Sequence, residues 1–148
     1  MCGICGIISN NSKLKDILSL MNQAIIHRGP DDEGYYLNEN IGLAMRRLSI
    51  IDLETGHQPM FSSDKKLVII FNGEIFNFRE IKERYLKEYH FTTKSDTEVV
   101  LYMFHKMGKS CLDLIQGIFV FAIYNIISRE LFVARDHFGV KPMYYYSD

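Results

Sequence analysis

The chain has 148 residues, of which 47% are hydrophobic, and 17 Lys and Arg against 18 Asp and Glu leave a formal net charge of -1. A chain of this length buries enough apolar surface to fold as one domain without disulfides or metals, and its near-neutral charge gives no field that would recruit nucleic acid or an anionic membrane. Its apolar runs are far shorter than the roughly 20 residues that cross a bilayer, and the N-terminus lacks a secretory-signal pattern, which favours the cytoplasm.

The first segments alternate apolar runs with polar breaks. Residues 2–9, "CGICGIIS", are apolar and precede the polar "NNS", as is typical of a buried strand that ends in a turn. Residues 13–26 place apolar side chains at helical spacing, with Asn11 or Ser12 available as the N-cap. The proline and glycines of "HRGPDDEG" end this helix, and we interpret that segment as a structural corner.

The next segments predict a growing sheet and two helices. Strand patterns occupy residues 34–37, 41–48 and 67–72, with the turn-rich "DLETGHQPM" between the last two. Asn77 with Glu80 has the spacing of a capping box and predicts a helix over residues 78–89.

A second capping-box pattern follows. Ser95 with Glu98 predicts the start of a helix that Gly108 ends. The remaining apolar segments, residues 117–125, 130–136 and 141–147, have the pattern of strands joined by short turns. Helices between two groups of strands predict an α+β fold of packed layers.

Cys2 stands directly behind the initiator methionine. If Met1 is removed, Cys2 carries a thiol and a free α-amino group, which supplies a nucleophile and a base on one residue. Cys2 and Cys5 also form a CxxC pair, but the sequence contains no second pair or paired-His motif to complete a zinc site, and a redox CxxC would begin a helix. We therefore interpret Cys5 and Cys111 as small core residues and expect no metal.

Three polar positions allow both a functional and a structural interpretation. Asn72 and Gly73 end an apolar strand, where they could hold an oxyanion or form a hairpin turn. Arg46 and Arg47 lie in a hydrophobic strand, so alternation sends one of them inward to a salt bridge or to a substrate carboxylate. Asp96 either supports its helix N-terminus or pairs with a substrate ammonium.

Several segments occur in a specific order over essentially the whole chain: "MCGICGI", "HRGPDDEG", "RRLSIIDLETGHQPM", "NGEIFNFREI", "SDTEVVLYMFHKMG", "IQGIFVFAIYN" and "ARDHFGVKPMYY". Together they closely resemble the N-terminal glutaminase domain of glutamine-hydrolysing asparagine synthetases. That domain is a class II glutamine amidotransferase of the N-terminal-nucleophile hydrolase superfamily. The "RLSIID" and "SDTE" segments are similar to this branch in particular, because the sister amidotransferases that make glucosamine phosphate or phosphoribosylamine differ there.

The resemblance implies a fold and the reacting groups. The expected fold is a four-layer αββα sandwich, in which two mainly antiparallel sheets lie face to face between helices. Cys2 is the implied nucleophile, and Asn72 with the N–H of Gly73 is the implied oxyanion hole.

The resemblance also implies how the substrate, L-glutamine, is bound. Arg47 holds its α-carboxylate, and Glu74 and Asp96 recognise its amino group. The backbone around Leu48 and Ile50 lines the same pocket. Each of these positions carries the residue type of the family motif.

The implied reaction is hydrolysis of the glutamine side-chain amide to glutamate and ammonia through a γ-glutamyl thioester on Cys2. It requires no metal or organic cofactor. In the family the ammonia reaches a C-terminal asparagine synthetase domain that uses ATP and Mg²⁺, and this sequence has no nucleotide-binding glycine-rich motif. We therefore expect residues 1–148 to be a glutaminase domain that is incomplete at its C-terminus and without its synthetase partner.

A second interpretation is a non-catalytic regulatory or interaction module of the same fold. The complete set of site residues favours the enzyme, whereas the shortened C-terminus favours the module. A sheet edge exposed by missing strands would allow a homodimer. Release of glutamate from glutamine distinguishes the two interpretations.

Overall fold

The structure, a computed structural model, describes residues 2–48 and 56–147, and in that part of the chain the strands form two antiparallel sheets. The first sheet has the order β1-β3-β2 and consists of β1 (Gly3–Ile8), β2 (Asp32–Asn38) and β3 (Ile41–Arg47). The second has the order β4-β5-β6-β7 and consists of β4 (Met60–Phe61), β5 (Leu67–Ile75), β6 (Gly117–Asn125) and β7 (Glu130–Arg135).

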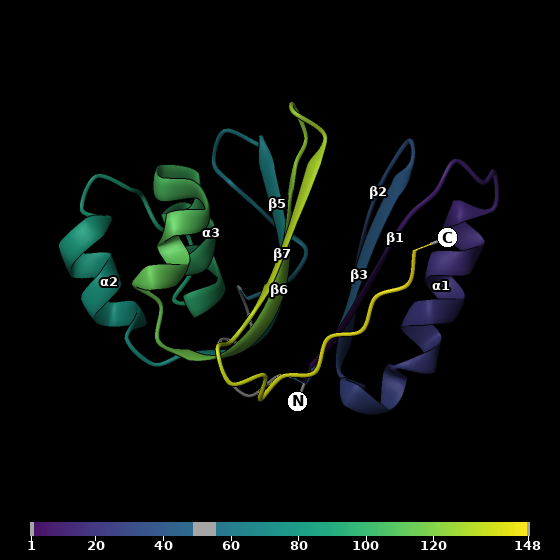
Figure 1. Cartoon of the computed structure of the whole chain (residues 1–148), viewed down its shortest axis with the longest axis horizontal. Coiled ribbons are helices and arrows are strands. Elements are labelled where there is room, and N and C mark those ends of the chain that lie inside the picture. The colour runs from purple at the N-terminus through teal and green to yellow at the C-terminus, as the bar shows by residue number, and fades with distance from the viewer. Residues whose placement is uncertain (1, 49–55, 148) are drawn as a thin grey trace.

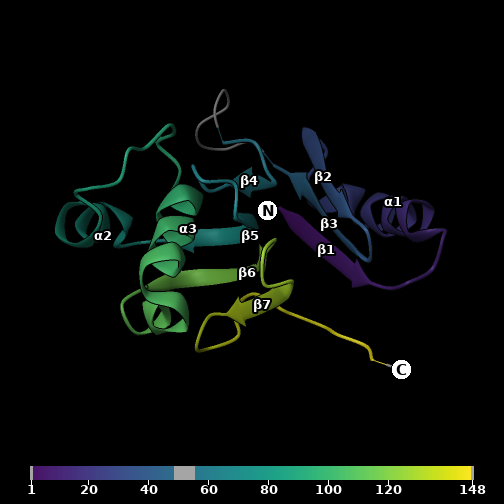
Figure 2. The same cartoon turned by 90° about the horizontal axis from the view of Figure 1, so that it is seen from above.

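The two sheets lie face to face between layers of helix (Figure 1). α1 (Leu14–Ala24) covers the outer face of the first sheet, whereas α2 (Phe78–Tyr85) and α3 (Asp96–Met107) cover that of the second. Short 3-10 helices follow α1 and α3, at Ile26–Arg28 and Gly108–Asp113. This arrangement confirms the predicted αββα order of layers. In the view from above, the N-terminus lies between the two sheets, beside β1 and β5 (Figure 2).

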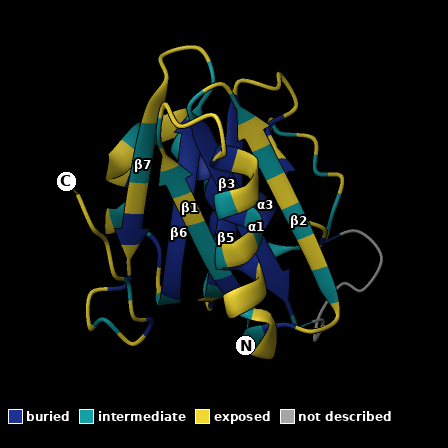
Figure 3. Ribbon diagram, turned by 90° about the vertical axis from the view of Figure 1, so that its right-hand side faces the viewer, coloured by how far each residue is buried: buried dark blue, intermediate teal, exposed yellow. Residues whose placement is uncertain are grey.

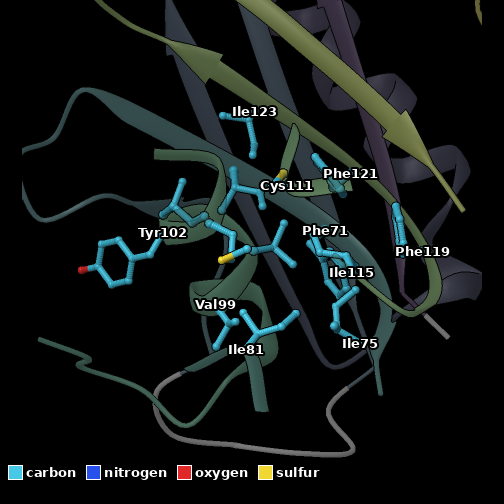
Figure 4. Close-up of a cluster of buried hydrophobic side chains, with 14 of the residues drawn as sticks. Phe71, Ile75, Ile81, Val99, Tyr102, Cys111, Ile115, Phe119, Phe121 and Ile123 are labelled. Carbon is cyan, nitrogen blue, oxygen red and sulfur yellow. The ribbon is translucent and has the colours of Figure 1, made fainter. Parts of the chain in front are cut away.

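Strand alternation divides the side chains of β5 between two apolar cores. Ile69, Phe71 and Ile75 face α2 and α3, where they pack with buried residues of the helices and of β6 (Figure 4). Val68 and Ile70 point the other way, into the interface between the sheets. β3 is buried along its whole length because α1 covers one of its faces and the second sheet covers the other (Figure 3).

β5 extends beyond Asn72, where the sequence pattern predicts its end. Its pairing with β6 continues as far as Ile75 opposite Gly117, so Asn72 and Gly73 lie inside a strand. The alternative of an Asn-Gly hairpin turn is therefore wrong. The strand continues because its partner comes from a distant part of the chain, which a local pattern cannot reveal.

Residues 141–147 do not form the predicted strand. Tyr144, Tyr145 and Tyr146 are 92%, 90% and 88% exposed. Tyrosine favours strands because it fits a pleated, half-buried surface, but in the described part of the chain no strand forms hydrogen-bonded pairs with this segment. The prediction is wrong because composition cannot show whether a neighbouring strand is present.

The predicted helix starts are confirmed only in part. Ser95 caps α3, because its Oγ accepts a hydrogen bond from the N–H of Thr97 at 3.1 Å. Glu98 does not complete a capping box, since its carboxylate binds the preceding loop instead. The box predicted for Asn77 and Glu80 is also wrong, because the Asn77 side chain bonds backbone groups just before β6.

Other boundaries also differ from the predictions. The cap residue of α1 is Lys13, whose N–H donates to the Asn11 side chain, so neither proposed residue caps the helix. α2 ends at Tyr85, and Tyr89 packs against the same core from a following turn. β4 lies at the end of the turn-rich stretch and was not predicted, because its two residues form a strand only through pairing with β5.

In the described part of the chain, no helix combines the length and apolar character needed to cross a membrane.

Glu98 ties α3 to the loop that precedes it. The residue is 2% exposed, and its carboxylate accepts hydrogen bonds from the N–H and hydroxyl groups of Thr92 and Thr93 at 2.7 to 3.0 Å. A buried acceptor with this many donors fixes the loop, because leaving any donor without a partner is costly.

We expect Glu98→Gln to lower the free energy of unfolding by about 2 kcal/mol, because the introduced NH₂ group faces donors. Glu80→Gln is the matched control. The exposed Glu80 lies 3.9 Å from Arg84, so its replacement should change stability by less than about 0.5 kcal/mol. Urea unfolding followed by circular dichroism measures both, and equal effects would contradict the role of Glu98.

Candidate active site

A pocket of about 280 Å³ opens where the ends of both sheets meet α3. Its lining includes every predicted site residue in the described part of the chain: Cys2, Arg47, Leu48, Asn72, Gly73, Glu74 and Asp96. Ile50 lies outside the described residues. The pocket is small and has the size of a site for a metabolite such as an amino acid.

Three strands contribute to this pocket in the same way. On each, the side chains that face the other sheet are apolar along the strand and polar at the end that reaches the pocket. Cys2 comes just before β1 and two residues ahead of the apolar Ile4, Met45 of β3 is followed by Arg47, and Ile70 of β5 is followed by Asn72. The interface between the sheets therefore continues into the pocket.

The outer edge of β5 presents backbone N–H groups to the same place. β4 pairs only with Val68 and Ile69. Beyond it, the N–H of Phe71 donates to Gln58 Oε1 at 2.6 Å, and the N–H of Ile75 donates to Asp96 Oδ2 at 2.9 Å.

Gly73 lies midway between those two residues. Backbone groups alternate sides along a strand, so the N–H of Gly73 points to the same edge as those of Phe71 and Ile75. The residue opposite Gly73 on β6, Phe119, supports this direction. Its N–H and C=O both form hydrogen bonds with Asp136 and so point away from β5, as in a non-hydrogen-bonded pair. The N–H of Gly73 is thus directed into the pocket.

Only glycine fits at position 73. A Cβ atom there would lie 2.2 Å from the carbonyl oxygen of Ile118 and 2.6 Å from the Cα of Phe119. The close approach of β5 and β6 therefore requires Gly73 and leaves its amide accessible beside the Asn72 side chain.

The pocket carries charges of both signs. Arg47, Lys94 and Lys141 bring positive charge, whereas Glu74 and Asp96 bring negative charge. A zwitterion such as an α-amino acid has complementary groups for both sets.

The charge of Asp96 is poorly stabilised in this pocket. Burial raises its pKa above the ordinary value, and the charge of Glu74 adds to the rise, although the N–H groups of Ile75 and Thr97 oppose it. A bound ammonium group would stabilise the carboxylate. The location therefore favours a ligand-binding role for Asp96 in addition to its position at the start of α3.

The CxxC cysteines face opposite sides of β1. Cys2 packs toward the interface between the sheets, whereas Cys5, at odd spacing from it, faces the other way. Burial raises the pKa of the Cys5 thiol to about 11, and Arg46 lowers it only in part. Cys5 is only half-buried, so the prediction that it is a core residue is wrong. Cys111 is fully buried, as predicted.

The two neighbouring arginines also separate. Arg46 faces α1, where it forms an ion pair with Glu33 at 2.7 Å and donates from Nε to the carbonyl of Asn22 at 3.2 Å. Arg47 faces the pocket. Alternation therefore gives one arginine the structural role and leaves the other to the site.

The "HRGPD" segment is the predicted structural corner. A Cβ on Gly29 would lie 2.5 Å from backbone atoms of both arginines, and the N–H of Asp31 donates to the carbonyl of Arg47 at 3.1 Å. This packing fixes the end of β3 that carries Arg47.

Sequence reasoning missed several pocket residues. They come from segments where no single residue signals chemistry, and they include Gln58, Phe78, Lys94, Thr97, Ile118 and Lys141. Most of them lie within the seven motif segments, which was the available signal. Among the described residues, no group of three or more His, Cys, Asp and Glu side chains has the arrangement of a metal site.

Comparisons with known proteins give separate evidence on the family and the fold. The profile of the glutamine amidotransferase domain matches residues 1–148. Asparagine synthetase [glutamine-hydrolyzing] 1 of Bacillus subtilis is 42% identical, over 98% of this chain and 24% of the relative. Asparagine synthetase B [glutamine-hydrolyzing] of Escherichia coli is 37% identical, over 97% of this chain and 26% of the relative. The chain thus spans about a quarter of these relatives' length.

A solved structure supports the fold. The glutamine phosphoribosylpyrophosphate amidotransferase of B. subtilis, complexed with ADP and GMP, superposes with a TM-score of 0.71 at 20% identity. The match covers 89% of this chain and 37% of the other. The predicted N-terminal-nucleophile hydrolase fold is confirmed.

Asp136 holds the loop that brings Lys141 to the pocket. The residue is 3% exposed, and its carboxylate accepts hydrogen bonds from the N–H groups of Phe119, Val140 and Lys141 at 2.9 to 3.3 Å. Burial acts to raise the pKa of Asp136, but these backbone donors outweigh it and lower the pKa below its ordinary value.

We expect Asp136→Asn to lower the free energy of unfolding by about 2 kcal/mol at neutral pH. Because the folded pKa is lowered, the charged form stabilises the fold above the unfolded pKa of about 3.9, and this contribution disappears as the pH falls through the folded pKa. The difference between the two proteins should therefore narrow below about pH 4. Denaturant unfolding at several pH values checks this, and a constant difference down to acid pH would refute it.

Proposed function

Because the chain belongs to the glutamine amidotransferase domain family, we propose that it hydrolyses the side-chain amide of L-glutamine to glutamate and ammonia. The observation that carries the proposal is the meeting of Cys2, Asn72 and Gly73 with charges of both signs in one amino-acid-sized pocket. The relatives from B. subtilis and E. coli are glutamine-hydrolysing asparagine synthetases, which is consistent with this substrate.

In the proposed complex, charge complementarity orients glutamine. The guanidinium of Arg47 binds the α-carboxylate, since its planar fork matches two carboxylate oxygens. Glu74 and Asp96 bind the α-ammonium group. The backbone around Leu48 completes the described part of the pocket, and the side-chain amide then extends toward Cys2.

The proposed nucleophile is the thiol of Cys2, activated by its own α-amino group once Met1 has been removed. An α-amino group has a pKa of about 7.7 to 8.0 and a thiol about 8.5, so the neutral amine can accept the thiol proton near neutral pH, directly or through one water. The thiol lies at the pocket wall, where Cys2 Sγ is 3.8 Å from the carbonyl oxygen of Leu48.

Attack of the thiolate on the amide carbon gives a tetrahedral oxyanion. The Asn72 side-chain amide and the N–H of Gly73 donate hydrogen bonds to it, and both donors are fixed before the charge develops. The α-ammonium of Cys2 protonates the departing ammonia, which leaves a γ-glutamyl thioester. Water then hydrolyses the thioester to glutamate and restores the thiol. Each proton moves between Cys2, substrate and water, so the proposed half-reaction uses no metal or organic cofactor.

We further propose that the ammonia serves asparagine synthesis from aspartate in an asparagine synthetase domain that uses ATP and Mg²⁺. The supporting observation is the name of the relatives, of which this chain matches about a quarter.

Cys2→Ala should abolish glutamate release from glutamine, because it removes the proposed nucleophile just before β1, where the partly buried side chain only borders the core between the sheets. Cys5→Ala is the matched control. It should retain turnover and cost on the order of 1 kcal/mol of stability, since Cys5 faces away from the pocket. A coupled assay for glutamate measures both. An inactive unaltered chain would support the non-catalytic module, and equal losses in both variants would contradict the assignment of the nucleophile.

Arg47→Lys should raise the KM for glutamine about tenfold or more and change kcat less. Lysine keeps the positive charge but loses the two parallel donors that match a carboxylate. Steady-state kinetics separate the two constants. An unchanged KM would show that the α-carboxylate binds elsewhere.

A further inference from the structure

We infer that Gln58 is a positioning residue that holds the oxyanion-binding segment of β5 in register, an inference that rests on the proposed glutaminase function. Gln58 comes from the "GHQPM" end of the turn-rich stretch and lines the pocket without belonging to the reacting groups. Its side chain connects the strand that carries Asn72 and Gly73 to the helix that carries Asp96.

Both ends of the Gln58 amide have a partner. Its Oε1 accepts from the N–H of Phe71 at 2.6 Å, and its Nε2 donates to Oγ1 of the buried Thr97 at 3.3 Å. The backbone N–H of Phe71 can only donate, so it fixes which end of the amide faces β5. A carboxamide of this length supplies the acceptor and the donor that the two sites require.

Gln58 replaces a strand partner for β5. β4 ends its pairing at Ile69, and the next N–H groups on that edge belong to Phe71, Gly73 and Ile75. The side chain of Gln58 accepts the hydrogen bond from Phe71, and that of Asp96 accepts the one from Ile75. The peptide between them is therefore held at both ends while the N–H of Gly73 remains directed at the substrate.

The segment that carries Gln58 is itself anchored to the first sheet. His57 Nδ1 lies 2.7 Å from Asp32 Oδ2 in β2. A Cβ on Gly34 would lie 1.8 Å from the carbonyl oxygen of Gln58, so β2 packs directly against this peptide. Gln58 therefore transmits the position of the first sheet, which carries Cys2 and Arg47, to the oxyanion donors on the second.

The test is the kinetics of glutamate release by the full chain carrying Gln58→Met, which keeps the side-chain length and removes both hydrogen bonds. We expect kcat to fall about tenfold or more, because small displacements of catalytic donors are costly, and KM to change less than about threefold. Thr97→Val removes only the second hydrogen bond and should lower kcat less. Gln23→Met, the same change at an exposed position of α1, should alter neither constant.

Amide hydrogen exchange gives a readout that does not depend on activity. In Gln58→Met, exchange should accelerate at Phe71, whose N–H loses its hydrogen-bond acceptor, while the β5 amides that pair with β6 stay protected. A folded Gln58→Met variant with kcat within twofold of the unaltered chain, or with unchanged exchange at Phe71, overturns the inference. An unaltered chain that releases no glutamate instead overturns the proposed function and this role with it.

Discussion

The short pairing between β4 and β5 is the constraint on which the site depends. Because β4 stops at Ile69, the outer edge of β5 is open from Phe71 to Ile75, and side chains rather than a strand bind its backbone. A longer β4 would engage the N–H of Gly73 in a sheet ladder. The open edge therefore leaves the N–H of Gly73 directed into the pocket, while pairing with β6 on the other edge of β5 holds the strand in place.

A second constraint is the shared direction of side chains at the end of the sandwich. At one end of β1, β3 and β5, the apolar residues of the interface give way to polar ones, so the packing that stabilises the fold also aligns Cys2, Arg47 and Asn72. Opposite charges in the resulting pocket match the two ends of an amino acid. Burial and the neighbouring charge of Glu74 raise the pKa of Asp96, so a cation bound beside this carboxylate would stabilise its charged form.

Much of this arrangement was predictable because it depends on local patterns. Alternation in β3 correctly sent one of two arginines inward, and the motif resemblance named the residues that the pocket brings together. The errors have a common cause. A local pattern does not show which other segments contact a residue. Such contacts decide where β5 ends, whether residues 141–147 form a strand, and which groups bind Glu98.

The sequence by itself determined the layers of the fold, the family and the identity of the candidate reacting residues, because periodicity, residue type and motif order are properties of the chain. Only the tertiary structure decided that Asn72 and Gly73 lie within a strand, that Cys2 and Cys5 face opposite sides, and that Gln58 joins β5 to α3. The physical reason is that hydrogen bonds and close packing depend on which distant segments meet. Only when the strands have paired is it settled which N–H and C=O groups are bonded within the sheet and which face the pocket.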